Sequence, residues 1–199
     1  AMRIVNGGIT AEIDRHGYIR FLNGKGEELV REYVRNRSDL SEFCVPLSRK
    51  ARLLTPVLGS EDWRAEVSFE AYEGERFYGL GQYQEDFLKG CTLELAQRNS
   101  QASIPFMLSS RGYGFLWNNP AVGNVTLGEN VTEWTAERTR QIDYWITAAD
   151  TPAQILENYT AVTGRVPMMR RDLMGFWQCK LRYQTQEELL EVAREYHRR

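Results

Sequence analysis

Residues 77–119 decide the fold of this chain, and they read FYGLGQYQEDFLKGCTLELAQRNSQASIPFMLSSRGYGFLWNN. The segment opens with a glycine-flanked turn, Gly79-Leu80-Gly81, and closes with two apolar runs, residues 104–108 and 113–117. A Ser-Ser-Arg-Gly turn separates the two runs, and apolar runs on either side of a glycine-containing turn are typical of a β-hairpin. We therefore predict antiparallel β-structure around this segment.

Two polar loops, residues 82–86 and 97–101, lie within the same segment. Polar loops carried by a β-scaffold are frequent sites of ligand contact. Amide side chains hydrogen-bond hydroxyl groups, and aromatic rings stack on apolar faces, so this combination suits a sugar. The alternative, that both loops only connect strands, stays open at this point.

Outward from this segment, apolar and polar residues alternate along residues 9–21 and 67–71, and residues 131–138 and 141–147 read as two more strands joined by a short turn. Turns at residues 15–17 and 23–26 divide the first of these stretches into a meander that includes His16 as a turn residue. Alternation of this kind indicates half-buried antiparallel strands, and short strands without intervening helices indicate a β-sandwich. The fold class we predict is mostly β, an antiparallel sandwich.

The pattern changes after Asp150. Thr151, Pro152 and Gln154 form a helix start with a capping box, and Gly164 marks the helix end. Residues 173–177 then form an apolar run typical of a strand buried on both faces, followed by a second capping box of Thr185 and Glu188. These features predict one closing helix and one βα unit.

A single βα unit cannot stand alone, because a parallel strand needs a parallel neighbour. We therefore predict two parts: residues 1–165 as the sandwich with its closing helix, and residues 166–199 as a linker and the first βα unit of a longer, here truncated, domain. The unpaired strand leaves two alternatives for the chain as it stands. It pairs with a second copy in a homo-oligomer, or it remains mobile.

Composition excludes several classes of protein. The chain has 199 residues, and 42% of them are hydrophobic, which disfavours disorder. Its net charge of −2 and pI near 5.9 disfavour binding to nucleic acid or to an anionic membrane. No apolar run reaches membrane-spanning length. Cys44, Cys91 and Cys179 are odd in number and form no CxxC pair, so we expect reduced thiols, a cytoplasmic location, and neither a metal site nor a cofactor.

Several pieces of the chain, in this order and spacing, resemble the galactose-mutarotase-like N-terminal β-sandwich domain of glycoside hydrolase family 31, the α-glucosidases and α-xylosidases. The matching pieces are FYGLGQ at 77–82, the loop through QRN at 97–99, IPF at 104–106, SSRGYGFLWNN at 109–119, QIDYWI at 141–146, TAVTGRVP at 160–167 and GFWQCKLRY at 175–183. The resemblance covers nearly the whole chain and is weakest over the first sixty residues. It implies that residues 173–199 begin a (β/α)₈ barrel.

The resemblance also implies an activity for the full-length protein, the retaining hydrolysis of α-glucosides or α-xylosides. Such enzymes need two carboxyl groups roughly 5 Å apart. Glu85 and Asp86 are adjacent in the chain and point in opposite directions if the loop is extended, so they do not suit this task. In the family the catalytic aspartates lie on later barrel strands. We therefore assign no catalytic residue to this chain and expect it to be inactive alone, with the missing barrel as its partner.

The same resemblance implies which residues contact substrate. Asn99, flanked by Gln97 and Arg98, takes the position of a sandwich loop that reaches the sugar pocket. Many α-glucosidases of the family carry Asp there, so Asn99 is a departure that leaves the sugar preference open. Lys180 and Tyr183 follow the first barrel strand, at the face where such barrels bind their substrates.

Two other functions are compatible with a sandwich. A free-standing carbohydrate-binding module explains the amides and aromatics, but it does not explain the unpaired βα unit. A mutarotase-like enzyme needs an acid/base pair that usually includes histidine. His16 lies in a predicted turn and His197 lies near the terminus, so the sequence disfavours this third function.

Overall fold

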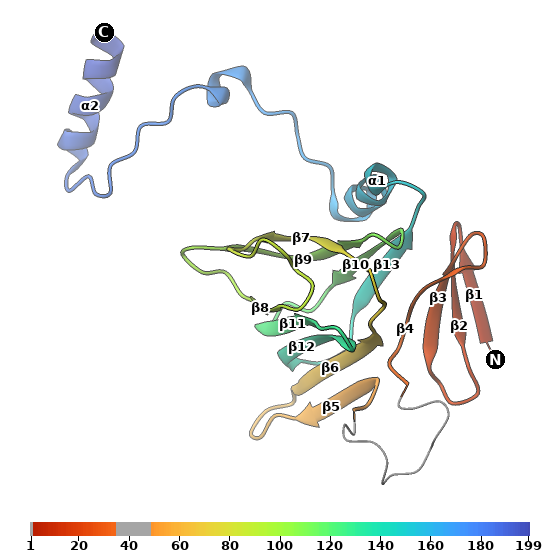
Figure 1. Ribbon diagram of the computed structural model, residues 1–199. Coiled ribbons are helices and arrows are strands. Elements are labelled where there is room, and N and C mark those ends of the chain that lie inside the picture. The colour runs from red at the N-terminus through yellow and green to blue at the C-terminus, as the bar shows by residue number, and fades with distance from the viewer. Residues whose placement is uncertain (1, 35–48) are drawn as a thin grey trace. The chain divides into compact units, whose positions relative to one another are not determined.

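The computed structural model describes residues 2–34 and 49–199, and Cys44 and Pro46 lie outside these ranges. The chain forms two compact units, Ala1–Gly164 and Arg165–Arg199 (Figure 1). The first unit carries all the strands of the described residues, and the second carries a 3₁₀ turn and a helix. No helix within the described ranges is long and apolar enough to cross a membrane.

The N-terminal meander is a four-stranded antiparallel sheet in the order β1-β2-β3-β4. Its strands are β1 (Met2–Asn6), β2 (Ile9–Ile13), β3 (Ile19–Asn23) and β4 (Glu28–Arg31). The β2–β3 turn is stabilised by Asp14, whose carboxylate accepts hydrogen bonds from the backbone amides of His16 (2.7 Å) and Tyr18 (3.0 Å). The predicted meander and the turn position of His16 are thus confirmed.

Two further antiparallel sheets form the sandwich. One has the order β13-β10-β9-β7, with β13 (Tyr144–Ala148), β10 (Tyr113–Trp117), β9 (Ala102–Ser109) and β7 (Phe77–Gln82). The other has the order β5-β6-β12-β11-β8, with β5 (Arg52–Pro56), β6 (Trp63–Glu70), β12 (Val131–Thr139), β11 (Gly123–Leu127) and β8 (Thr92–Leu95). The predicted hairpin of β9 and β10 is confirmed, with Ser109 opposite Tyr113. β12 and β13, although consecutive, belong to different sheets.

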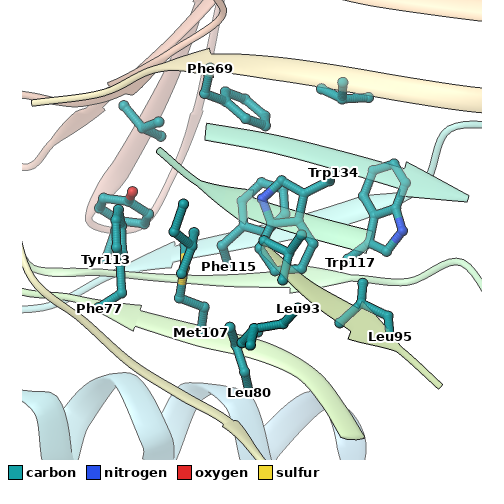
Figure 2. Packing of buried hydrophobic residues seen from close by; sticks show 14 of the residues in the cluster. Phe69, Phe77, Leu80, Leu93, Leu95, Met107, Tyr113, Phe115, Trp117 and Trp134 are labelled. Atoms are coloured by element: carbon teal, nitrogen blue, oxygen red, sulfur yellow. The ribbon is translucent and has the colours of Figure 1, made fainter. Parts of the chain in front are cut away.

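Aromatic side chains fill the space between the sheets (Figure 2). Phe115 of β10 lies 5.0 Å from Trp134 of β12 and 5.3 Å from Phe69 of β6, measured between ring centroids. Trp117 lies 6.1 Å from Trp134. Each of these four rings is almost fully buried. Because aromatic side chains bury large areas and prefer such tilted or offset contacts, this cluster is the main source of cohesion between the two sheets.

A buried carboxylate joins the meander to the sandwich. Glu32, directly after β4, forms an isolated bridge with Phe69 of β6. Its carboxylate accepts a hydrogen bond from the Ile19 backbone amide at 2.9 Å and pairs with the Arg52 guanidinium at 2.9 Å. Burial raises the pKa of Glu32, and the Ile19 amide and Arg52 partly oppose this rise. A buried charge of this kind holds its partners in one arrangement, because any shift would leave it unpaired.

The closing helix α1 (Pro152–Thr163) begins and ends as the sequence predicts. Thr151 and Gln154 form the capping box, and Gly164 follows the last turn with a φ of +107°. Ile155 is buried against the sheet, and the ring of Tyr159 stacks on Phe106 of β9 with centroids 3.9 Å apart. Two other apolar residues of the helix, Leu156 and Val162, are exposed.

The second unit differs from the expected βα unit in its first half. Residues 173–177 are predicted as a buried strand, but residues 173 and 174 lie in a 3₁₀ turn, η2 (Arg171–Met174), and residues 175–177 form no strand. Met174, Phe176 and Trp177 are 74%, 78% and 71% exposed. In the described residues this segment has no neighbouring strand to pair with. Its backbone N–H and C=O groups therefore hydrogen-bond to water, and a strand does not form.

The helical half of the unit forms as predicted. The helix α2 (Gln186–Arg198) is capped by the Thr185 hydroxyl, which accepts from the Glu188 amide at 3.2 Å. The Glu188 carboxylate accepts from the Gln184 backbone amide at 2.9 Å, one residue before the position that a capping box requires.

Candidate functional site

A bulge in β7 presents the first of the two polar loops. Gly79, Leu80 and Gly81 have φ angles of +98°, +65° and +96°, and the pairing register between β7 and β9 shifts across them. A Cβ on Gly81 would lie 2.0 Å from the Ala102 carbonyl oxygen, so only glycine fits there. The bulge buries Leu80 completely in the core and turns the chain into the loop that starts at Tyr83.

A cleft of about 840 Å³ runs along β7 and the β7–β8 loop. Its lining combines aromatic side chains with carboxylates, namely Phe77, Tyr78, Tyr83 and Phe87 with Glu75, Glu85, Asp86 and Glu129. Glu85 and Asp86, the adjacent pair considered for catalysis, are both exposed. Across the described residues, no group of His, Cys, Asp and Glu side chains is arranged to hold a metal ion.

The floor of this cleft includes Glu75, a carboxylate that is 4% exposed. It accepts hydrogen bonds from the Ser109 hydroxyl at 2.5 Å and the Tyr113 hydroxyl at 2.9 Å. Burial raises the pKa of Glu75 above its ordinary value, and the two hydrogen bonds oppose the rise. Sequence reasoning did not single out Glu75, because its partners lie more than thirty residues further along the chain.

Asn99 lies at the tip of a tight turn between β8 and β9. The Gln101 amide donates to the Arg98 carbonyl at 3.3 Å, and these two residues form a bridge, so Asn99 and Ser100 occupy the two central positions. Both are exposed. Within residues 2–34 and 49–199, neither side chain has a hydrogen-bond partner. The turn therefore offers the amide of Asn99 to solvent with its donor and acceptor groups unused.

The side chains beside Asn99 are occupied by contacts within the loop. The Gln97 carboxamide donates to the Ser103 carbonyl at 2.7 Å and accepts from the Ser103 amide at 3.1 Å. Arg98 forms a two-pronged pair with Glu94, at 2.9 Å and 2.6 Å. This hydrogen bonding lowers the pKa of Glu94. Of the three residues predicted from this loop, Asn99 is therefore the one with a free hydrogen-bonding side chain.

Lys180 and Tyr183, the other two predicted site residues, lie in the second unit. Lys180 pairs with the Glu188 carboxylate, and its ammonium group lies 5.9 Å from the centroid of the Tyr183 ring. The Tyr183 hydroxyl accepts from the Gln178 amide at 3.3 Å. The structure thus brings Lys180 and Tyr183 together, as it brings Gln97, Arg98 and Asn99 together, each set within its own unit.

Known proteins similar to this chain share one family. A family 31 glucosidase of Pseudescherichia vulneris is 46% identical over 98% of this chain and 39% of its own length. An α-xylosidase of Saccharolobus solfataricus is 36% identical over 69% of this chain and 20% of its own length. No family model matches the chain.

Comparison with solved structures points to the same family. The crystal structure of a glycoside hydrolase family 31 α-xylosidase from a soil metagenome, complexed with xylose, is 55% identical to this chain with a TM-score of 0.86. The match covers 98% of this chain and 30% of the solved one. This chain thus spans between a fifth and two fifths of the length of these relatives.

Proposed function

This chain is homologous to the N-terminal part of glycoside hydrolase family 31 enzymes, and from that premise we propose that it is the N-terminal domain of a retaining α-glycosidase. The full-length enzyme hydrolyses α-xylosides or α-glucosides, with the α-xyloside as the preferred substrate. The observation that carries this proposal is the 55% identity, at a TM-score of 0.86, to a family 31 α-xylosidase complexed with xylose.

The role of this domain in the reaction is substrate recognition. Asn99 contacts the sugar, because its exposed amide can donate to one hydroxyl and accept from another. Lys180 and Tyr183 contribute from the segment before α2. The side chains of Gln97 and Arg98 support the loop that carries Asn99. The two carboxyl groups of the retaining mechanism come from the remainder of the enzyme.

The test compares two proteins, the full-length enzyme and the 199-residue chain, on 4-nitrophenyl α-xyloside and 4-nitrophenyl α-glucoside. The full-length enzyme should hydrolyse at least one of them, with the larger kcat/KM on the xyloside, and the product should keep the α configuration. The 199-residue chain should give no turnover. Turnover by the purified chain, or an inert full-length protein on every α-glycoside, would contradict the proposal.

A further inference from the structure

The turn that carries Asn99 is held by side chains that hydrogen-bond to the segments next to it. Its own backbone supplies one hydrogen bond across the tip, from Gln101 to Arg98 at 3.3 Å. A two-residue tip held by one long hydrogen bond is a weak support for a side chain that must keep one orientation. Contacts to neighbouring segments therefore decide where the Asn99 amide points.

The first brace is the Gln97 side chain, which forms the pair of backbone hydrogen bonds that a neighbouring strand would otherwise form. β10 pairs with β9 only from Phe106 to Ser109, so β10 does not pair with Ser103. The Gln97 carboxamide pairs there with both backbone groups of Ser103, at 2.7 Å and 3.1 Å. One side chain thus ties the chain just before the tip to the strand just after it.

The second brace is the Tyr83 hydroxyl, which comes from the β7–β8 loop. It donates to the Glu94 carbonyl at 2.8 Å and lies 2.8 Å from the Ser103 hydroxyl. Its ring packs against the hydrophobic core, so the hydroxyl has a fixed origin. Tyr83 therefore joins β8 of one sheet to β9 of the other at the base of the Asn99 turn.

The other contacts of this turn are an exposed ion pair and the hydrogen bonds of the Gln101 side chain. The Arg98–Glu94 pair lies on the surface, with the two side chains 58% and 40% exposed. Exposed pairs of this kind contribute little, because water and salt screen them. The Gln101 side-chain amide donates to the Ala96 carbonyl at 2.9 Å and to the Glu94 carbonyl at 3.5 Å. Tyr83 and Gln97 are thus the two braces whose side chains hydrogen-bond to Ser103 of β9, on the far side of the tip.

We propose that Tyr83 and Gln97 are positioning residues of the sugar site: they act on the substrate only through Asn99, by holding its turn in the orientation that binds. This inference rests on the proposed function. It differs from a purely structural role, because removing either brace should change substrate binding by the same route as removing Asn99.

The test is a double-mutant cycle in the full-length enzyme on 4-nitrophenyl α-xyloside, with Asn99→Ala, Tyr83→Phe and Gln97→Ala. Each single variant should lower kcat/KM roughly three- to tenfold, mainly through a raised KM. In the Asn99→Ala background, Tyr83→Phe and Gln97→Ala should each change kcat/KM by less than about twofold, since the residue through which they act is gone. Tyr18→Phe is the matched control, because Tyr18 is a half-buried tyrosine between β2 and β3 whose hydroxyl makes no hydrogen bond in the described residues, and it should behave as wild type.

Three outcomes separate the inference from its premise. If Asn99→Ala has normal kinetics, the assignment of this loop to the sugar site fails. If Asn99→Ala is impaired but Tyr83→Phe and Gln97→Ala add their full effects to it, the positioning role fails and the proposed function stands. Hydrogen exchange gives a second readout, because Gln97→Ala removes the acceptor of the Ser103 backbone amide and should make that amide exchange faster. Unchanged protection of the Ser103 amide would show that Gln97 does not hold the turn.

Discussion

Glu75 shows how a single residue can set the pH response of the fold. Its carboxyl group is buried beneath the β9–β10 turn and accepts hydrogen bonds from Ser109 and Tyr113. Burial penalises the charged form, so the pKa of Glu75 in the folded chain lies above its ordinary value of 4.5. The positive charges of Arg111 and Lys89 oppose the shift without cancelling it. The folded chain therefore binds a proton here more tightly than the unfolded chain does.

This difference predicts a loss of stability with rising pH. The contribution of Glu75 is fully present below pH 4.5 and is lost as the pH rises through the raised, folded-state pKa. Glu75→Gln keeps an oxygen acceptor for Ser109 and Tyr113 but does not titrate. We compare the free energies of unfolding of the variant and of wild type, measured in urea. As the pH rises from 4.5, the difference between them should shift in favour of the variant, by at most about 1.4 kcal/mol per pH unit.

Glu73→Gln is the matched control, since Glu73 is an exposed carboxylate two residues away in the same turn, and it should parallel wild type. Burial also raises the pKa of Glu32, so part of the slope should remain in the Glu75 variant. Identical slopes for Glu75→Gln and wild type would show that the buried carboxyl does not titrate over this range.

At the scale of residues, the sequence predicts local chemistry and misses long-range pairs. The turn role of His16 and the cap formed by Thr151 and Gln154 depend on neighbours within four positions, and they can be predicted from spacing. The burial of Glu32 depends on Arg52 and Phe69, and that of Glu75 on Ser109. Nothing local marks a glutamate that will meet such partners, so neither buried acid can be recognised in advance.

At the scale of elements, the helix α1 and the strand β10 fit together through a glycine. A Cβ on Gly114 would lie 2.6 Å from the Ile155 side chain and 2.9 Å from the Phe106 ring, so the bare backbone of Gly114 makes the space that Ile155 fills. Ile155 is the one fully buried residue of the helix. The docking of α1 on the sheet therefore depends mainly on this one side chain and on the stacking of Tyr159 on Phe106.

Ile155→Ala should lower the free energy of unfolding by about 2–5 kcal/mol, because it removes a fully buried side chain and leaves a cavity over Gly114. Leu156→Ala is the matched control at the next position of the same helix, where the side chain is 45% exposed, and it should cost much less. Chemical denaturation followed by tryptophan fluorescence measures both. Equal losses for the two variants would show that burial at Ile155 is not what holds the helix.

Elements differ in how well the sequence predicts them, and the reason is the range of their interactions. The helices follow from caps and from the hydrogen bonds within each helix, so both appear where the sequence predicts them. A strand needs a partner. Residues 104–117 carry both strands and the turn of a hairpin and are predicted correctly, whereas residues 173–177 contain an apolar run without a partner and do not form a strand.

At the scale of the whole molecule, alternation predicts a sandwich but does not say how the strands are shared among sheets. The predicted meander is confirmed, and the structure shows that it forms a sheet of its own. The strands β12 and β13, joined by a short turn, belong to opposite sheets of the sandwich. Trp134 of β12 and Tyr144 of β13 both stack on Phe115, with ring centroids 5.0 Å and 5.2 Å away. The site residues divide in the same way, with Asn99 in the first unit and Lys180 and Tyr183 in the second.

The second unit should change its structure when it has strands to pair with. In the described chain, residues 173 and 174 belong to the 3₁₀ turn η2, in which the Leu173 amide donates to the Arg170 carbonyl at 3.1 Å, and none of residues 173–177 pairs with a strand. The apolar side chains of Met174, Phe176 and Trp177 are exposed. Such a run is suited to a strand with neighbours on both sides, as in the barrel that the resemblance to family 31 predicts here.

Hydrogen exchange on two proteins tests this expectation. In the 199-residue chain, kept monomeric and checked by size-exclusion chromatography, the amides of residues 173–177 should exchange almost as fast as in an unfolded peptide, while those of β10 stay protected. In the full-length enzyme the same five amides should become strongly protected, because parallel neighbours then accept and donate their hydrogen bonds. Strong protection in the monomeric chain would mean that residues 173–177 find partners within this chain, and fast exchange in the full-length enzyme would mean that they are not a barrel strand.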